Sequence, residues 1–109
     1  MKLRTNDVYI LFTLLEGPRH GYRIAQQIEE MTGGAARLEA GNLHRTVQKL
    51  MRGGLVEVSD DRPPPEEDDP RRRYYAITAK GERELGRETD RLRALVKALE
   101  ARGLGERAG

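Results

Sequence analysis

The segment of the chain with the clearest chemical potential is residues 41–52, "GNLHRTVQKLMR". Leu43, Val47 and Leu50 recur at helical spacing, which predicts a helix with one apolar side. The rest of the segment carries donors and cations and no carboxylate: Asn42, His44, Arg45, Gln48, Lys49 and Arg52. Arginine and lysine donate to guanine O6 and N7, and asparagine and glutamine pair with adenine. The pattern favours a helix that enters the major groove of DNA, although ordinary solvated helices also show it.

Other site chemistry has little support in the sequence. The 109-residue chain has no cysteine and two histidines, His20 and His44, so no metal site is expected. Its one serine, Ser59, lacks a plausible histidine and carboxylate arrangement for nucleophilic catalysis. The acidic run at residues 66–69 lacks the glycine-spaced loop of a calcium site and is interpreted as solvated charge. We predict a protein that is not an enzyme and needs no cofactor.

Two further helices are predicted before this segment. The first starts at a cap from Asn6 or Asp7 and stops at Gly17-Pro18, because proline cannot continue a helix. Its apolar face is expected to hold Val8, Leu11, Phe12 and Leu15. The second begins near His20-Gly21, where His20 is expected to pack the turn, and it ends at Gly33-Gly34. Its stripe is Tyr22 or Ala25, then Ile24, Ile28 and Met31. Helices two and three then form a helix-turn-helix.

A β-hairpin is predicted after the third helix, which stops at Gly53-Gly54. Residues 55–59, "LVEVS", and 72–78, "RRYYAIT", have the β-branched and aromatic content of strands. The intervening "DDRPPPEEDDPRR" has four prolines and six acidic residues, so it is expected to be a long solvated loop. This acidic stretch precedes a basic one, since residues 71–109 carry eleven basic and six acidic side chains. The hairpin would form the wing of a winged helix-turn-helix.

The last predicted element is a long charged helix that starts at the N-cap Thr78. Its apolar positions form a two-heptad seam, interrupted by Gly86 and Thr89: Leu85, Leu92, Leu95, Val96 and Leu99. A protruding helix with such a seam needs a partner, so these residues are predicted to form a homodimer interface. No apolar run approaches the roughly 20 residues that span a bilayer, and no signal-peptide pattern opens the chain. A cytoplasmic protein away from membranes is expected.

The segments "GPRHGY", "GNLHRTVQKLMRGGLVE" and "RRRYYAIT..G", in this order, resemble the PadR family of transcriptional regulators. The resemblance spans about residues 8 to 100 and implies a winged helix-turn-helix with a dimerising C-terminal helix. It further implies a repressor that binds palindromic DNA, and some members release DNA on binding a small aromatic or drug-like molecule. The chain departs from the family at His44, where a tyrosine is usual, so operator preference is not carried over.

The expected fold is mainly α with a small β-hairpin, in three parts. Residues 1–77 would form the winged helix-turn-helix DNA-binding domain, residues 78–102 the dimerisation helix and residues 103–109 a flexible tail. Base or near-base contacts are assigned to Asn42, His44, Arg45, Gln48 and Lys49. Phosphate contacts are assigned to Tyr22, Arg52, Arg71, Arg72 and Arg73.

Two other functions fit the same elements. One is a winged-helix module that holds another protein without touching DNA, because a fold does not fix a function. The other is a small-molecule sensor built around a dimer cavity, but the chain has no tryptophan and one phenylalanine to line such a cavity. The leading expectation is a homodimeric, sequence-specific DNA-binding regulator with double-stranded DNA and a second copy of itself as partners.

Overall fold

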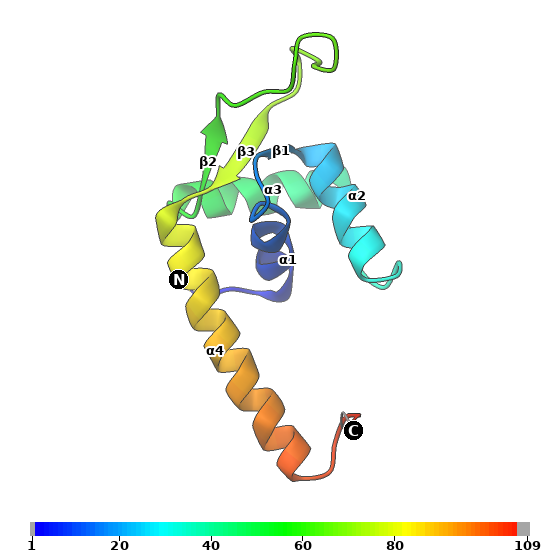
Figure 1. The fold of residues 1–109 in the computed structure, drawn as a ribbon, viewed down its shortest axis with the longest axis vertical. Coiled ribbons are helices and arrows are strands. Elements are labelled where there is room, and N and C mark those ends of the chain that lie inside the picture. The colour runs from blue at the N-terminus through cyan, green and yellow to red at the C-terminus, as the bar shows by residue number, and fades with distance from the viewer. Residues whose placement is uncertain (1, 107–109) are drawn as a thin grey trace.

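The computed structural model describes residues 2–106 and contains four helices and a small sheet (Figure 1). The three helices of the body are α1 (Thr5–Thr13), α2 (Gly21–Met31) and α3 (Ala40–Arg52). The strands are β1 (Arg19–His20), β2 (Val56–Ser59) and β3 (Tyr74–Ile77), and α4 (Ala79–Ala101) is the long arm. The predicted winged helix-turn-helix, mainly helical with a hairpin, is confirmed.

The sheet has one strand more than the sequence predicts. Strand β3 lies in the middle and pairs antiparallel with both neighbours, in the order β1-β3-β2. His20 lies opposite Tyr74 on one side, and Ser59 lies opposite Tyr74 on the other. Strand β1 has only two residues, too few for any alternation to show in the sequence. It attaches the start of α2 to the base of the wing.

The core collects aliphatic side chains from all three body helices. The stripe predicted for α3 is confirmed, because Leu43, Val47 and Leu50 are all buried. The predicted stripe of α2 is correct at Ile24 and Ile28, which are fully buried. Of the alternatives Tyr22 and Ala25, Ala25 packs against the core and Tyr22 is exposed, as is Met31. The remaining buried side chains of the core include Ile10, Leu11, Leu14, Leu55, Val56 and Tyr75.

The prediction for the first helix was correct at Leu11, which is buried, and at Val8, which packs partly buried against the core, but wrong at Phe12 and Leu15 and in its cap. Phe12 and Leu15 are 46% and 49% exposed, whereas Ile10 and Leu14 are buried beside Leu11. Because "VYILFTLL" is apolar on more than one side, helical spacing alone could not choose the buried face. The N-cap is Arg4, and its backbone N–H donates to the carboxylate of Asp7 at 2.8 Å, three residues inside the helix.

The junction between the wing and α4 is tight. Thr78 caps α4 as predicted, since its hydroxyl accepts from the Gly81 N–H at 3.0 Å and donates to the Gly54 carbonyl at 2.6 Å. At Gly81 the helix passes directly over the start of β2. A methyl group there would collide with the Leu55 carbonyl oxygen and lie 2.7 Å from Cγ1 of Ile77. Glycine is therefore required for this close crossing.

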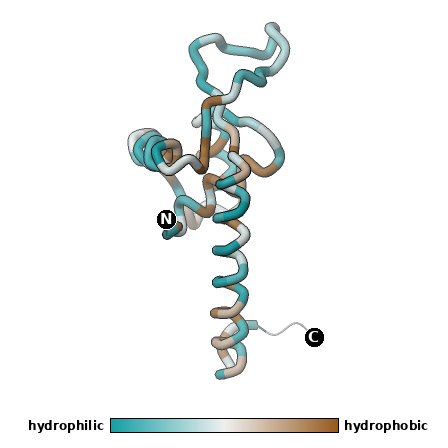
Figure 2. Tube along the Cα trace, turned by 90° about the vertical axis from the view of Figure 1, so that its left-hand side faces the viewer, coloured by the Kyte–Doolittle hydropathy of each residue, from teal (hydrophilic) through white to brown (hydrophobic). Residues whose placement is uncertain are grey.

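Helix α4 runs away from the body, on the side opposite the wing, and gives the molecule its longest dimension of 52 Å (Figure 1). Hydrophobic positions recur along α4 between hydrophilic ones (Figure 2). The helix ends at Ala101, one residue before the predicted boundary, and residues 107–109 of the expected tail lie outside the described residues. No helix within residues 2–106 is both long and apolar enough to cross a membrane.

Candidate nucleic-acid interface

The outward side of α3 carries the polar side chains predicted to contact DNA. Because Leu43, Val47 and Leu50 are anchored in the core, the helix is held with this side toward solvent. Asn42, His44, Arg45 and Arg52 are exposed and Gln48 is half-buried. Among the described residues 2–106, no hydrogen bond or ion pair engages the side chain of any of these five. Their donors are available to an external partner.

Arg45 reaches back toward the start of α3. A methyl group placed on Gly41 would lie 3.5 Å from a guanidinium nitrogen of Arg45, so the side chain covers the first turn of the helix. In helix-turn-helix proteins the N-terminal part of the second helix approaches the base edges. The guanidinium of Arg45, a planar group with five N–H donors, is thus placed at the part of the helix that could donate to base edges.

A groove of about 570 Å³ joins the start of α2, the start of α3 and the base of the wing. Its walls include four residues that the sequence analysis assigned to DNA contacts, namely Tyr22, His44, Arg72 and Arg73. Leu43, Val47 and Tyr75 also line it and are buried, so they form an apolar floor. Residues 22, 44 and 72–73 are distant in sequence, and the fold collects them on one surface.

His20 has the structural role that was predicted. Its Nδ1 accepts the Arg23 backbone N–H at 3.2 Å and so caps α2, and its ring meets Tyr74 edge-on with centroids 5.5 Å apart. Burial lowers the pKa of His20, and the nearby positive charges of Arg72 and Arg23 lower it further. A neutral imidazole is the form that can accept the capping hydrogen bond.

Lys49 is placed differently from the other polar residues of α3. Its ammonium donates to Oδ2 of Asp7 at 3.0 Å and lies 2.9 Å from Oδ1. Asp7 is almost completely buried, whereas the Lys49 side chain is 38% exposed. The predicted base contact of Lys49 therefore has a competing partner inside the protein. The sequence analysis named Asp7 only as a possible helix cap. Its pairing with Lys49 was not predicted, because the two residues are 42 positions apart.

The wing is folded by its own salt bridges. Arg62 makes two hydrogen bonds to the carboxylate of Asp68, at 2.7 and 2.9 Å, and its guanidinium lies 4.9 Å from the ring centre of Tyr74. Arg71 pairs with Asp69 at 3.1 Å and holds the pKa of that carboxyl down at about 2. Of the three predicted wing arginines, Arg72 and Arg73 have no side-chain ion pair within the described residues.

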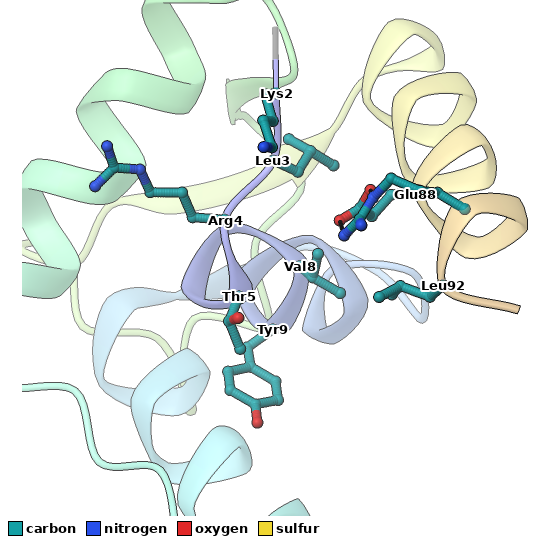
Figure 3. Close-up of a pocket in the computed structure, with 9 residues that line it drawn as sticks. Lys2, Leu3, Arg4, Thr5, Val8, Tyr9, Glu88 and Leu92 are labelled. Carbon is teal, nitrogen blue, oxygen red and sulfur yellow. Dashed lines mark hydrogen bonds and ion pairs between the residues drawn. The ribbon is translucent and has the colours of Figure 1, made fainter. Parts of the chain in front are cut away.

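A second set of residues borders α3 on its other flank and was not predicted. Arg4, Thr5 and Asn6, at the start of α1, line a polar cleft of about 350 Å³ with Asn42, Thr46 and Lys49. The side chain of Arg4 extends toward α3 (Figure 3). The sequence signal was weak, since Arg4 precedes the first apolar turn and resembles any exposed terminal residue. The polar side of α3 is thus framed by α1 on one side and by the groove on the other.

The predicted dimerisation residues of α4 divide into two groups. Leu92, Leu95, Val96 and Leu99 are between 38% and 51% exposed, which fits an unpartnered stripe. Leu85 is 8% exposed and packs in the core of its own domain, so it is not available to a second chain. The difference arises because only the first turns of α4 lie against the body.

A pocket of about 710 Å³ lies where α4 leaves α1. Val8 and Leu92 face into the gap from the two helices (Figure 3). Beside it, Glu88 accepts two hydrogen bonds from Arg91, at 2.6 and 2.8 Å, and these bonds lower the pKa of Glu88. Leu92, which belongs to the exposed stripe of α4, lines one side of the pocket. That side of the pocket faces solvent in a single chain.

Solved structures with this arrangement of elements are transcription regulators. A transcriptional regulator from Clostridium thermocellum shares 23% identity over 87% of this chain and 89% of that chain, with a TM-score of 0.71. A PadR family regulator from Clostridium difficile shares 23% identity over 87% of this chain and 94% of that chain, also with a TM-score of 0.71.

The PadR of Bacillus subtilis, solved in complex with operator DNA, has the same fold. It shares 21% identity over 79% of this chain and 47% of that chain, with a TM-score of 0.66. Among curated proteins, none matches this chain in sequence. A sequence model of the transcriptional regulator PadR-like family matches residues 10–87, from α1 through the first turns of α4. The chain therefore belongs to the PadR-like family of transcriptional regulators.

Proposed function

We propose that this regulator is a homodimer that binds a palindromic operator in double-stranded DNA and represses transcription. Helix α3 enters the major groove, and the proposed base contacts come from Asn42, His44, Arg45 and Gln48. Phosphate contacts come from Tyr22, Arg52, Arg72 and Arg73. The protein acts as a binding protein, not as an enzyme, in the cytoplasm where its DNA lies.

One observation carries this proposal: the uncommitted donors of α3, α2 and the wing share one surface. Tyr22, His44, Arg72 and Arg73 line the groove beside the exposed face of α3. Cations without internal partners are what a phosphate backbone recruits, and amide and guanidinium groups on a helix are what read base edges. The operator complex of the B. subtilis protein indicates that this fold can serve such a function.

Two residues of the sequence-based set have smaller roles in the proposal. Lys49 is not among the base contacts, because its ammonium is bound to Asp7. Arg71 is not among the main phosphate contacts, because its guanidinium is paired with Asp69. The tip of the wing carries Glu66 and Glu67, whose charges repel phosphate. We expect the wing to touch DNA at its base, through Arg72 and Arg73.

The dimer would form through the exposed stripe of α4. The same chain also exposes Phe12 near the end of α1 and Leu15 in the turn that follows, a second apolar patch that the body does not cover. Exposed apolar patches of this kind mark interaction surfaces more often than isolated residues do. A second copy that covered both would place two α3 helices about one duplex turn apart, roughly 34–36 Å. A palindromic site with that half-site spacing is the expected operator.

A small-molecule effector would act most directly at the pocket between α1 and α4. Leu92 belongs both to this pocket and to the exposed stripe, so a ligand seated there would touch the dimer contact. Displacement of α4 would change the spacing of the two α3 helices and weaken operator binding.

Footprinting of the DNA upstream of the protein's own gene tests the proposal. The expected result is two protected half-sites related by twofold symmetry and separated by one turn of the duplex. Gel shifts at two salt concentrations should show weaker binding at high salt, because bound phosphates release counterions. A chain that leaves this DNA unprotected and shifts no duplex at low salt would instead favour the protein-interaction module.

A further inference from the structure

Asp7 is a buried carboxylate whose only cationic partner among the described residues belongs to α3. Its side chain is 1% exposed. Oδ2 accepts the Arg4 backbone N–H at 2.8 Å and the Lys49 ammonium at 3.0 Å. Oδ1 lies 2.9 Å from the same ammonium but accepts no aligned hydrogen bond from any described residue. The pair joins the first turn of α1 to the last turns of α3.

Fold stability alone is a poor explanation for this pair. Removing the carboxylate of Asp7 from water costs several kcal/mol, and apolar residues of similar volume often stabilise a protein as well as a buried ion pair does. A charge pair does, however, fix where each charge lies. Here it fixes the ammonium of Lys49 on the flank of α3 that faces α1.

The position of Lys49 makes its charge relevant to DNA. It lines the polar cleft beside Asn42 and Thr46, on the edge of the proposed DNA-facing surface. The side chain is 38% exposed, so its ammonium is close to solvent and would be released by the loss of Asp7. Lysine has a flexible four-carbon stem and acts as a point charge, so it binds phosphates with little regard to sequence.

We propose that Asp7 is a specificity-determining residue that acts through Lys49. By holding the ammonium, Asp7 removes one sequence-independent phosphate contact from the DNA-facing surface. By the same bond it anchors α3 to α1 and so holds Asn42 and Arg45 at a fixed height over the bases. This inference rests on the proposed DNA-binding function of α3.

The test compares Asp7→Asn with the double variant Asp7→Asn/Lys49→Met. Asparagine keeps the shape of the side chain and releases the ammonium, and the double variant leaves no unpaired charge in the interior. Two duplexes serve as probes: one that the wild-type chain selects from a randomised pool, and a scrambled duplex of the same composition. Affinities are measured from 50 to 200 mM salt, and circular dichroism and thermal unfolding confirm that each variant folds.

Asp7→Asn is expected to bind the scrambled duplex more tightly at low salt. One added phosphate contact in each protomer steepens the salt dependence of the dimer by about 1.8, which is an extra loss of about 12-fold between 50 and 200 mM salt. The ratio of selected to scrambled affinity should fall. The double variant should return to the wild-type salt dependence, because Lys49 contributes no contact when Asp7 holds it. Asp90→Asn, an equal change of charge on the exposed side of α4, should leave the ratio unchanged.

Two results would overturn the inference while the DNA-binding function stands. One is a salt dependence of Asp7→Asn equal to that of the wild type. The other is a double variant whose salt dependence is flatter than that of the wild-type dimer by about 1.8, since the Lys49 of each protomer would then already contact phosphate. A wild-type chain that selects no duplex from the pool would overturn the inference and the proposed function together.

Discussion

Helices α3 and α4 carry the same kind of amphipathic pattern, but the molecule treats their apolar sides in opposite ways. In α3 the apolar residues are sealed into the core, and Leu50 is 0% exposed. In α4 the large apolar residues after Leu85 stay in solvent, and Val96 is 51% exposed. The same periodicity therefore predicts an apolar contact without saying which chain supplies it. The free side of α3 is polar and suits DNA, and the free side of α4 is apolar and suits a second copy.

The largest difference should appear when a leucine is truncated on each helix. Leu50→Ala is expected to destabilise the fold by about 2–5 kcal/mol at every protein concentration, because it leaves a cavity in the core. Leu92→Ala should have an effect that depends on protein concentration, because the contact it weakens lies between chains. Urea unfolding at two widely separated concentrations measures both.

Leu95→Ala is the matched check, since Leu95 is also exposed on α4 and should follow Leu92. If Leu92→Ala destabilises the chain equally at both concentrations, the stripe packs within one chain and the contrast between the helices disappears.

The next effect concerns assembly. Leu92→Asp with Leu99→Asp should dissociate the proposed dimer and lower operator affinity by about 100-fold, because two linked half-sites bind far more tightly than one. Analytical ultracentrifugation reports the mass, and gel shifts report the affinity. Asp90→Ala with Lys97→Ala alters the opposite side of α4 and should change neither. A double aspartate variant that sediments as a dimer would refute the assignment of the stripe.

A smaller effect separates two arginines on the DNA-facing surface. Arg45→Ala should cost about 1–3 kcal/mol of discrimination at one base position, because a bidentate contact to guanine is lost. Arg72→Ala should weaken binding to all sequences alike and flatten the salt dependence of the dimer by about 1.8, because each protomer loses only a phosphate contact. Binding to a panel of single-base operator variants measures the first, and salt titration the second.

If Arg45→Ala binds the single-base operator variants in the same order of affinity as the wild type, Arg45 is not a base contact. An altered ranking by Arg72→Ala would show that the wing also reads bases.

The smallest effect is a pH dependence of the body between neutral pH and about pH 5. Because burial lowers the pKa of His20, its imidazole binds a proton more weakly in the folded chain than in the unfolded chain. The stabilisation is complete above the unfolded value near 6.5 and is lost as pH falls through the lowered folded pKa. Lowering the pH from neutral to about 5 should therefore lower the melting temperature of the wild type more than that of His20→Asn, which keeps a capping side chain. Thermal unfolding at each pH measures this difference. Equal weakening of both proteins would mean that His20 does not carry the dependence.

The elements could be predicted because their signals are local. The stripe of α3, the cap at Thr78 and the paired glycines after α2 and α3 each lie within a few residues, and the structure has them where the sequence predicts. The two-residue strand β1 has no such signal. No local signal shows that Ile10 and Leu14 are buried and that Phe12 and Leu15 are exposed, because this segment is apolar on several sides.

The candidate site could be predicted only in part for a related reason. The polar face of α3 follows from its own spacing, and its exposure agrees with that reading. The pairing of Lys49 with Asp7 joins segments 42 residues apart, so it depends on how α1 crosses α3. The burial of Leu85 likewise depends on where α4 first meets the body.

Gly81 makes the junction of α4 with the wing a stiff pivot. Helix α4 continues from there to Ala101, and at about 1.5 Å per residue the arm beyond Gly81 is roughly 30 Å long. A tilt of about 10° at the pivot would carry the far tip through roughly 5 Å, given that length. The close packing at Gly81 therefore sets the angle at which α4 leaves the body. In the proposed dimer this angle would set the spacing of the two α3 helices, although Gly81 itself would contact neither DNA nor the second chain.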